Sequence, residues 1–360
     1  MPGRPLHIIH ILPALPFGGA ERCVVDIVNQ ASTDFRFTIL TFSNQLALAE
    51  EITNPTCGLK IVPKRGKLAL DLVGRLEQTL VELRPDIVHT HLFAGDVWGR
   101  LAARRLRVPV VTTEHNLNIG EKGLRNFIRF ILRNQSDRYA ACSEAVAAYM
   151  RRVYRITKPI TVIKYGIALN RFASIPPLNP VLSEMRILML GRLVPQKGFD
   201  IGLRALALIK QYPWRLKIVG QGPLRGELQT LVDELGLSER VTFVPPTHQV
   251  PELFEQSDVL LMPSRWEGLG IVAMEAMAAG RLVVANQVDG LAELFCDAVT
   301  GCYIKQNTPQ GVAERLAWCF NNWSEVCRIA VGAKAQAQVQ FGVARMVRSY
   351  EAWYHLAAQR

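Results

Sequence analysis

The 360-residue sequence contains no apolar run long enough to cross a membrane. A transmembrane helix needs about 18 or more consecutive apolar residues, and the most apolar stretch, residues 269–285, is broken by Glu275 and Arg281. An apolar segment near the N-terminus, residues 1–12, is interrupted by two histidines and is followed by no small-residue cleavage site. These features favour a buried strand over a signal peptide there. We therefore expect a cytoplasmic protein that is soluble or peripheral at the inner face of the cytoplasmic membrane.

The sequence also lacks cysteine pairs of the kinds that bind zinc or form disulfide frameworks. Its seven cysteines include no CxxC pair, and their number is odd. This usage is typical of reduced thiols in the core of a cytosolic protein.

The first half of the chain predicts repeated βα units. At 360 residues the chain exceeds the size at which single cores usually stop growing, so two domains are expected. Short β-branched runs alternate with amphipathic stretches, which is typical of a parallel sheet with helices around it. Strands are predicted at residues 7–12, 37–41, 86–90, 109–113, 138–141 and 160–163. Residues 173–183 contain three prolines and are predicted to be a linker.

The alternation then restarts, with strands predicted at residues 186–190, 216–219, 241–244, 259–262 and 282–285. We expect an α/β protein with two Rossmann-like domains, over residues 1–172 and 184–344, whose parallel sheets face a central cleft. A C-terminal helix, from about residue 345 to 360, is expected to pack back on the first domain. Each half opens with a strand that runs into a glycine-bearing loop, where open α/β sheets bind ligands.

The segment 263–275 is the strongest functional motif. Gly268 and Gly270 let the backbone approach a ligand closely, and a helix that begins near Gly270 adds a positive dipole end. Glu267 and Glu275 would lie at most ~12 Å apart along a helix axis, which suits a carboxylate at each end of a nucleotide sugar. The alternative is that Glu275 caps a helix on a solvated face, against which its apolar neighbours argue.

Two cations are placed to bind a diphosphate. Arg192 and Lys197 lie in the loop after the first strand of the second domain. Fixed cations there would stabilise the negative charge that grows on a leaving phosphate. No two aspartates stand two residues apart, so the Asp-x-Asp pair that holds a divalent ion is absent. We expect donor binding to need no metal; the alternative for Arg192 is a surface salt bridge.

These motifs together resemble the large retaining GT-B glycosyltransferase family, family 4. Two glutamates separated by seven residues in an EGLG context are similar to its donor motif, and further pieces occur in the same order along almost the whole chain: Gly18-Gly19-Ala20-Glu21, Glu114-His115-Asn116, residues 137–143, Gly191-Arg192 with Lys197-Gly198, and residues 219–223. The resemblance implies a retaining, metal-independent hexosyltransferase that uses a UDP- or GDP-linked sugar. The implied acceptor is a glycan or lipid-linked molecule in cell-surface polysaccharide or lipopolysaccharide biosynthesis.

The resemblance also implies site residues. Catalytic roles fall to Glu267, His115, Arg192 and Lys197, and donor binding to Gly18, Gly19, Gly220, Val244, Gly268, Leu269, Gly270, Ile271 and Glu275. His115 would be a hydrogen-bond partner or proton acceptor near the acceptor hydroxyl, although a lone histidine is more often structural. His89 and His91 look like a metal pair without a nearby third ligand, so we expect them to pack at a strand end. Rival functions are a nucleotide-sugar epimerase or phosphorylase of this fold, or a non-catalytic nucleotide-sugar or membrane-surface binding protein.

Positive charge is concentrated in the first half. Residues 1–170 hold 23 Lys and Arg against 14 Asp and Glu, whereas the remainder holds 19 against 17. No nucleic-acid-binding motif accompanies this charge, so an anionic lipid or acceptor is the better partner. Arg125, Arg129 and Arg133, at i, i+4 and i+8, predict a basic stripe on one helix with apolar side chains on its other faces. The alternative is an ordinary surface helix packed on the core.

Overall fold

A computed structural model describes residues 4–66, 71–120 and 123–359, and these divide into two compact units. The first unit comprises the described residues up to Gly166 and from Val343 onward, and the second is Ile167–Gly342. The predicted linker, residues 173–183, thus falls within the second unit. Ile175 and Leu178 are buried there, at 4% and 8% exposure, which explains why this proline-bearing segment groups with the second unit.

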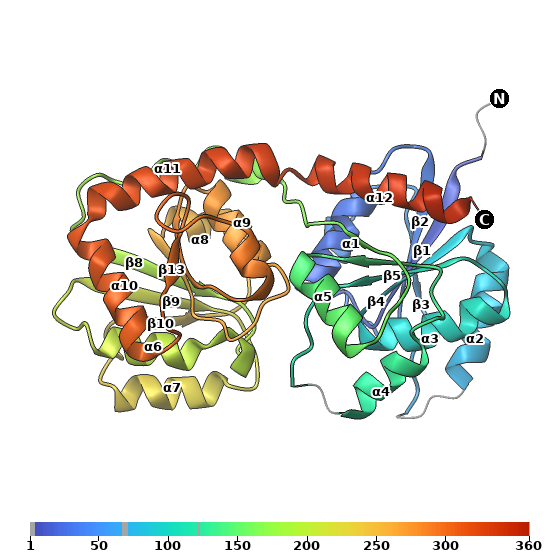
Figure 1. Cartoon of the computed structure of the whole chain (residues 1–360), viewed down its shortest axis with the longest axis horizontal. Coiled ribbons are helices and arrows are strands. Elements are labelled where there is room, and N and C mark those ends of the chain that lie inside the picture. The colour runs from blue at the N-terminus through green and yellow to red at the C-terminus, as the bar shows by residue number, and fades with distance from the viewer. Residues whose placement is uncertain (1–3, 67–70, 121–122, 360) are drawn as a thin grey trace. The chain divides into compact units, whose positions relative to one another are not determined.

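The first unit is built on a seven-stranded parallel sheet with the strand order β3-β2-β1-β4-β5-β6-β7 (Figure 1). Its strands are β1 (Leu6–Leu12), β2 (Phe35–Thr41), β3 (Gly58–Ile61), β4 (Ile87–His91), β5 (Val110–Glu114), β6 (Arg138–Ala141) and β7 (Ile160–Val162). Its helices are α1 (Gly19–Gln30), α2 (Asp71–Leu83), α3 (Leu92–Arg105), α4 (Gly123–Ile131), α5 (Glu144–Val153) and α12 (Val343–Ala358), with a 3₁₀ turn η1 (Ala49–Glu51). Helices α1 and α12 pack together, and α2 packs with α3.

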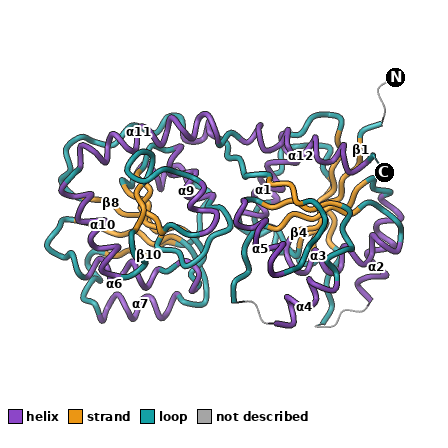
Figure 2. The backbone as a smooth tube through the Cα atoms, viewed as in Figure 1, coloured by secondary structure: helices purple, strands orange, loops and turns teal. Residues whose placement is uncertain are grey.

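The second unit repeats this plan with a six-stranded parallel sheet in the order β10-β9-β8-β11-β12-β13. Its strands are β8 (Met185–Leu190), β9 (Trp214–Val219), β10 (Val241–Val244), β11 (Val259–Met262), β12 (Leu282–Asn286) and β13 (Cys302–Ile304). Its helices are α6 (Phe199–Ala207), α7 (Arg225–Glu234), α8 (Val250–Glu255), α9 (Ile271–Ala278), α10 (Pro309–Asn321) and α11 (Trp323–Gln340), with 3₁₀ turns η2 (Leu169–Phe172), η3 (Pro195–Lys197) and η4 (Asp289–Glu293). In each unit the strands form a central layer flanked by helices (Figure 2).

The eleven predicted strands are confirmed to within two residues, and two strands were missed. All four residues of β3 are exposed at the sheet edge, so their sequence carries no buried face. Strand β13 has only three residues. Both are short edge strands, for which hydrophobic periodicity is a weak signal.

In each parallel sheet there is one place from which successive strands are added on opposite sides. Strand β1 lies between β2 and β4, and β8 lies between β9 and β11. In open α/β sheets, ligands bind beyond the carboxyl ends of the strands at this switch point. The glycines after β1 and the loops after β8 and β11 lie at these places.

The C-terminal helix α12 belongs to the first unit. It packs on α1 and β4, and it buries Tyr350, Trp353 and Tyr354. The Tyr354 hydroxyl lies 2.8 Å from His89 Nδ1, so this helix seals a histidine-bearing face of the sheet. Among the helices of the described chain, none is both long and apolar enough to span a bilayer.

Candidate active site

The structure brings two predicted site residues together in the second unit. Lys197 ends the 3₁₀ turn after β8, and Glu267 lies in the loop after β11. The Lys197 ammonium donates a hydrogen bond to Glu267 Oε1 at 2.6 Å, and the Ser264 hydroxyl donates to the same oxygen at 2.8 Å. Glu267 is buried, and the Lys197 side chain keeps 17% of its surface exposed. The partly exposed Lys197 ammonium thus lies at the switch point and is paired with the buried Glu267 carboxylate.

The loop that carries Glu267 is held by neighbouring loops. Gln196 Nε2 donates to Trp266 O at 3.0 Å, and the Gln196 carbonyl accepts from the Arg265 amide at 2.8 Å. On the other side the Glu267 amide donates to Asp289 Oδ2 at 3.2 Å. These contacts fix the carboxylate in place. Ser264, Gln196 and Asp289 were not predicted to contribute; Ser264 could have been found from its place in the 263–275 motif.

Two glycines allow the loops after β8, β9 and β11 to approach each other. At Gly198, where φ is +65°, an added Cβ would lie 2.0 Å from the Pro263 carbonyl oxygen. At Gly220 an added Cβ would lie 1.9 Å from the Gly191 carbonyl oxygen. The Gly220 amide donates to Val244 O at 3.0 Å, so these two predicted donor-binding positions also lie together.

Helix α9 presents its N-terminus at the same edge. It is capped by Gly270, whose φ is +95°, and its first turn carries no acidic residue. Gly268 and Leu269 are buried, whereas Gly270 and Ile271 are partly exposed. Unpaired amides at a helix N-terminus bind anions. Glu275 lies four residues after Ile271 on α9, about 6 Å along the axis, and is half-buried among buried neighbours rather than on a solvated face.

Arg192 lies in the same loop as Lys197 and is exposed. A lysine ammonium has three N–H donors. In Lys197 one of the three binds Glu267. Two remain for phosphate oxygens. The second unit therefore holds the chemical groups that a nucleoside diphosphate needs: cations, helix amides and carboxylates for hydroxyl groups.

In the first unit, Gly18 and Gly19 lie at the start of α1, after β1. An added Cβ at Gly18 would lie 2.2 Å from Glu21 Oε2, because the Glu21 side chain folds back over this glycine. Glu21 is itself buried. A side chain at position 18 would therefore displace the Glu21 carboxylate from this place.

His115 follows β5 and is buried in a hydrogen-bonded chain. Its Nδ1 lies 2.5 Å from the Tyr165 hydroxyl, and its Nε2 lies 2.8 Å from His91 Nδ1. His91 Nε2 in turn lies 2.9 Å from His10 Nδ1. Burial lowers the pKa of His115 to about 3, so its ring is neutral near pH 7. Both ring nitrogens are engaged, which the sequence did not reveal.

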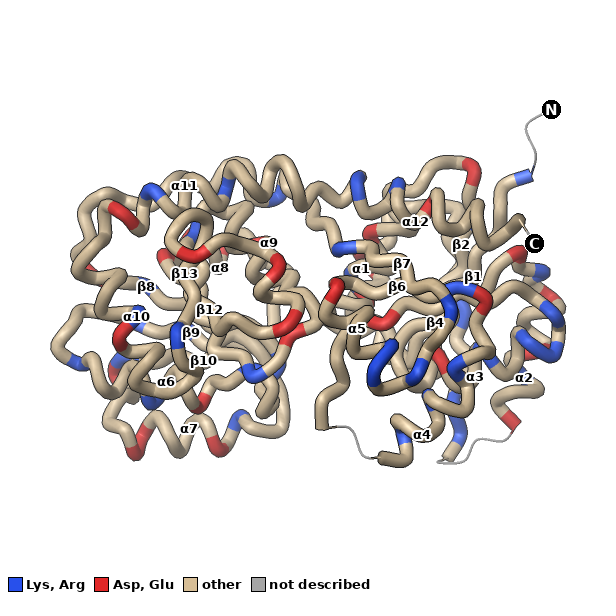
Figure 3. The backbone as a smooth tube through the Cα atoms, viewed as in Figure 1, with Lys and Arg blue, Asp and Glu red and all other residues tan. Residues whose placement is uncertain are grey.

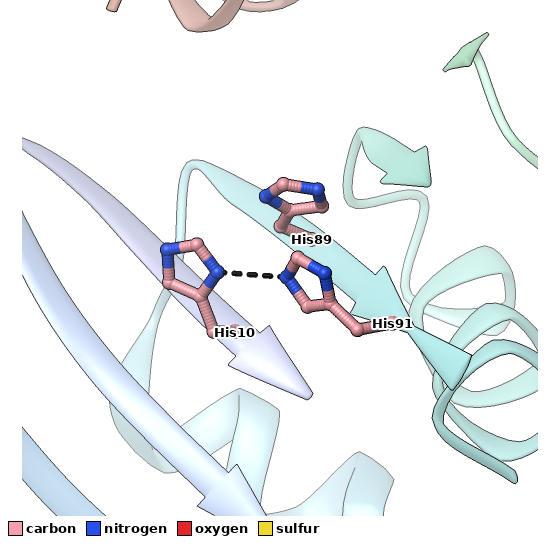
Figure 4. Close-up of side chains that lie close together, drawn as sticks. All are labelled: His10, His89 and His91. Carbon is pink, nitrogen blue, oxygen red and sulfur yellow. Dashed lines mark hydrogen bonds between the residues drawn. The ribbon is translucent and has the colours of Figure 1, made fainter. Parts of the chain in front are cut away.

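His10, His89 and His91 form a cluster on one sheet face (Figure 4). His10 and His89 are register partners in β1 and β4, and a ligand atom from each of the three lies within 4.8 Å of the others. The prediction that His89 and His91 have no third histidine nearby was therefore wrong, since pairing of β1 with β4 supplies His10.

Five of the six ring nitrogens of this cluster have hydrogen-bond partners. His89 binds Thr113 Oγ1 and the Tyr354 hydroxyl, both at 2.8 Å. Within the described part of the chain, His10 Nε2 alone among the six nitrogens lacks a partner. Burial lowers the pKa of His10 to about 3 and those of His89 and His91 well below 6.5. We interpret the cluster as a network of neutral, hydrogen-bonded imidazoles.

The predicted basic stripe of Arg125, Arg129 and Arg133 is not formed. Arg129 is buried at 4% exposure, where it faces Glu114 and stacks over the rings of Phe93 and Tyr154, and Arg133 lies beyond the end of α4. The helix instead exposes apolar side chains: Leu124 at 69%, Phe127 at 58% and Ile131 at 55%. The buried carboxylate and the two rings explain why Arg129 packs inward, whereas Arg125 is exposed.

Comparison with known proteins identifies the family of this chain. The model of the family Glycosyltransferase Family 4 matches residues 17–171, and that of Glycosyl transferases group 1 matches residues 171–336. The chain is 25% identical over 344 residues to an uncharacterized glycosyltransferase of Haemophilus influenzae, covering 93% of this chain and 95% of that protein. It is 32% identical over 278 residues to the D-inositol 3-phosphate glycosyltransferase of Mycobacterium leprae, covering 70% of this chain and only 63% of that protein.

The fold is also found in solved structures. That of Anabaena Alr3699/HepE in complex with UDP and glucose matches with a TM-score of 0.85 at 22% identity, covering 97% of this chain and 99% of that one. Two parallel α/β sheets in two units are the GT-B architecture expected from the sequence. This chain is therefore a member of glycosyltransferase family 4, the glycosyl transferases group 1, with a GT-B fold.

Proposed function

We propose that this protein is a retaining hexosyltransferase that moves a sugar from a UDP- or GDP-linked donor to a glycan or lipid-linked acceptor, without a metal. The observation that carries the proposal is the Lys197–Glu267 pair at the switch point of the second sheet, beside the N-terminus of α9. UDP is the first candidate nucleotide, because the similar Anabaena structure binds UDP and glucose. The pathway we propose is cell-surface polysaccharide or lipopolysaccharide synthesis.

Each donor-site residue has a proposed role. Lys197, Arg192 and the α9 amides at Gly270 and Ile271 bind the diphosphate and stabilise its charge as the sugar leaves. Glu267 accepts hydrogen bonds from the hexose together with the loop at Gly268 and Leu269. The nucleoside lies along Gly220 and Val244, with its ribose hydroxyls on Glu275. Gly18 and Gly19 of the first unit are further proposed donor contacts.

The acceptor is proposed to bind to the first unit, near His115. Its imidazole is neutral, so we propose it as a hydrogen-bond partner of the acceptor hydroxyl, which would replace the Tyr165 hydroxyl at Nδ1. No side chain of the described chain emerges as a covalent nucleophile. We therefore propose that retention results from same-face attack, with the leaving phosphate as the base.

We also propose an anionic membrane surface as a partner, through α4. Its exposed Leu124, Phe127 and Ile131 lie at i, i+3 and i+7 and so share one face. Residues 123–166, which include α4 and α5, hold nine Lys and Arg against two Asp and Glu. Figure 3 marks basic positions in blue near these two helices. An exposed apolar helix face in a segment rich in basic residues suits the interface of an anionic bilayer. The partner is the one expected from the sequence, but the proposed contact is the exposed apolar face of α4 and not the basic stripe.

A ligand panel tests the proposed function. UDP, GDP, ADP and their hexose conjugates are compared by thermal shift, and the stabilising donor is then assayed for hydrolysis and transfer with glycan and lipid-linked acceptors. A ligand at 100 times its Kd stabilises the folded state by about 2.7 kcal/mol. Transfer with retained anomeric configuration is expected. Binding without hydrolysis or transfer would instead support a non-catalytic nucleotide-sugar binding protein, and a changed sugar without transfer would support an epimerase.

A further inference from the structure

A buried carboxylate lies beside the proposed acceptor-binding residue. Glu114 ends β5, immediately before His115, and its side chain is 5% exposed. Its Oε1 accepts hydrogen bonds from Asn118 Nδ2 at 3.0 Å and from the His115 backbone amide at 3.3 Å. The Glu114 carboxylate therefore links the first and last residues of the loop 115–118 through hydrogen bonds to one oxygen.

The loop needs this support because of its backbone conformation. Asn118 has a φ of +50°, in the left-handed region that asparagine tolerates better than most residues. Its amide nitrogen also donates to the Tyr154 hydroxyl at 3.0 Å. A third acceptor of the same nitrogen is Asn116 O at 3.3 Å, so hydrogen bonds to Glu114, Tyr154 and Asn116 hold the side chain that fixes the turn after His115.

Arg129 supplies the counter-charge of this carboxylate from α4. Its Nε lies 3.7 Å from Glu114 Oε2, and its side chain is 4% exposed. The guanidinium lies 5.0 Å from the ring centres of both Phe93 and Tyr154. Burial raises the pKa of the Glu114 carboxyl, Arg129 opposes that shift, and Asp96 of α3 adds to it.

We propose that Glu114 and Arg129 are positioning residues for acceptor transfer, which hold the loop 115–118, and with it His115, in the productive conformation. This inference rests on the proposed function. Without Arg129, Glu114 becomes a buried charge near Asp96 with no cation at Oε2, and such a group is strongly destabilising. The carboxyl then takes up a proton or shifts, and the loop loses its anchor.

The test compares Arg129→Met with Arg105→Met. Arg105 is a matched control because it pairs with Glu77 at 2.9 Å in the same unit, but with a side chain that is 67% exposed. We expect Arg129→Met to lower acceptor kcat/KM by about 10-fold or more and the Tm by about 6 °C or more. UDP affinity and donor hydrolysis should stay unchanged, because the residues proposed to bind the diphosphate and the nucleoside, Lys197, Arg192 and Glu275, lie in the second unit. Arg105→Met should match the wild type throughout.

Two further variants keep the test decisive if Arg129→Met does not fold. The double variant Glu114→Gln/Arg129→Met removes both charges but keeps an acceptor oxygen for Asn118, so it should recover the Tm and kcat/KM to within about threefold of the wild type. Asn118→Gly tolerates the left-handed backbone but loses the bond to Glu114, so it should lower acceptor kcat/KM with little change in Tm.

Wild-type acceptor kinetics in Asn118→Gly and in any folded Arg129→Met would overturn this inference, as would an equal fall in donor hydrolysis and acceptor transfer. If the wild-type protein neither hydrolyses any donor nor transfers its sugar, the proposed function itself is wrong. The two failures are therefore distinguishable.

Discussion

Lys197 and Glu267 are 70 residues apart in the sequence, and their side chains meet at 2.6 Å between Nζ and Oε1. The pair joins the loop after β8 to the loop after β11. Neither group acts alone: the carboxylate orients the ammonium, and the ammonium compensates a buried charge. Removing either one should affect both the chemistry and the loop.

Lys197→Ala should lower turnover by about 10²-fold or more, as expected for loss of a preorganised donor to the leaving phosphate. Lys217→Ala is a matched control, because Lys217 lies in the same unit and hydrogen-bonds Gln256 at an exposed site. Initial rates at saturating donor and acceptor measure the effect. An unchanged rate would mean that the phosphate binds elsewhere.

Glu275→Gln should weaken UDP binding by about 10-fold, because a charged acceptor binds ribose hydroxyls more strongly than a neutral amide does. Calorimetric titration with free UDP measures the Kd without interference from turnover. Glu234→Gln, at an exposed position on α7, should bind UDP like the wild type. The same Kd in Glu275→Gln and wild type would contradict the ribose role.

Chelation should leave donor binding and transfer unchanged. Lys197, Arg192 and the N-terminus of α9 supply the positive charge that a divalent ion would otherwise bring to the diphosphate. The measurement is the transfer rate and the Kd of UDP in EDTA and in excess Mn²⁺. Loss of transfer in EDTA that manganese restores would refute metal independence.

Acid should destabilise the first unit through its histidines. Burial lowers the pKa of His10 and His115 to about 3 from their ordinary value of 6.5. Below pH 6.5 these two histidines become protonated in the unfolded chain, whereas in the folded chain they stay neutral down to about pH 3. The contribution of these histidines to the free energy of unfolding should therefore be constant above pH 6.5 and fall below it. At pH 5 the loss relative to pH 7 should be about 2 kcal/mol per histidine.

Denaturant unfolding at pH 7 and pH 5 measures this loss. His10→Gln should reduce the difference between the two pH values, since it removes one proton-binding group of the unfolded chain. His248→Gln, at an exposed position in the second unit, should leave the difference as in the wild type. A stability that does not change between pH 7 and pH 5 would show that these imidazoles are not held neutral.

Vesicle binding should depend on the apolar face of α4. Phe127→Gln/Ile131→Gln should reduce sedimentation with anionic vesicles by about 10-fold, since apolar burial and basic residues together bind anionic interfaces. Val339→Gln controls for exposed apolar area, because Val339 is 80% exposed in the second unit. Binding should weaken with salt and be small on neutral vesicles. Equal binding of the double variant and wild type would exclude α4 as the contact.

The sequence by itself determined the α/β architecture and the positions of the donor motif. Parallel strands are buried on both faces and therefore appear as continuous apolar runs, which located β8 and β11 from their residues alone. Because the carboxyl ends of parallel strands meet at one edge, a motif directly after a strand is placed without any knowledge of tertiary contacts. Lys197 and Glu267 were predicted as site residues in this way, and the structure brings their side chains together.

Only the tertiary structure decided which groups face each other. Periodicity shows that α4 has two faces but not which one is buried, and the inward face was set by Glu114, which is distant in the sequence from Arg129. The register of β1 against β4 likewise placed His10 beside His89. Pairing between distant segments depends on the packing of the whole unit. A buried charge or polar group without a partner costs much more free energy than an exposed one, so packing decides which partners are needed.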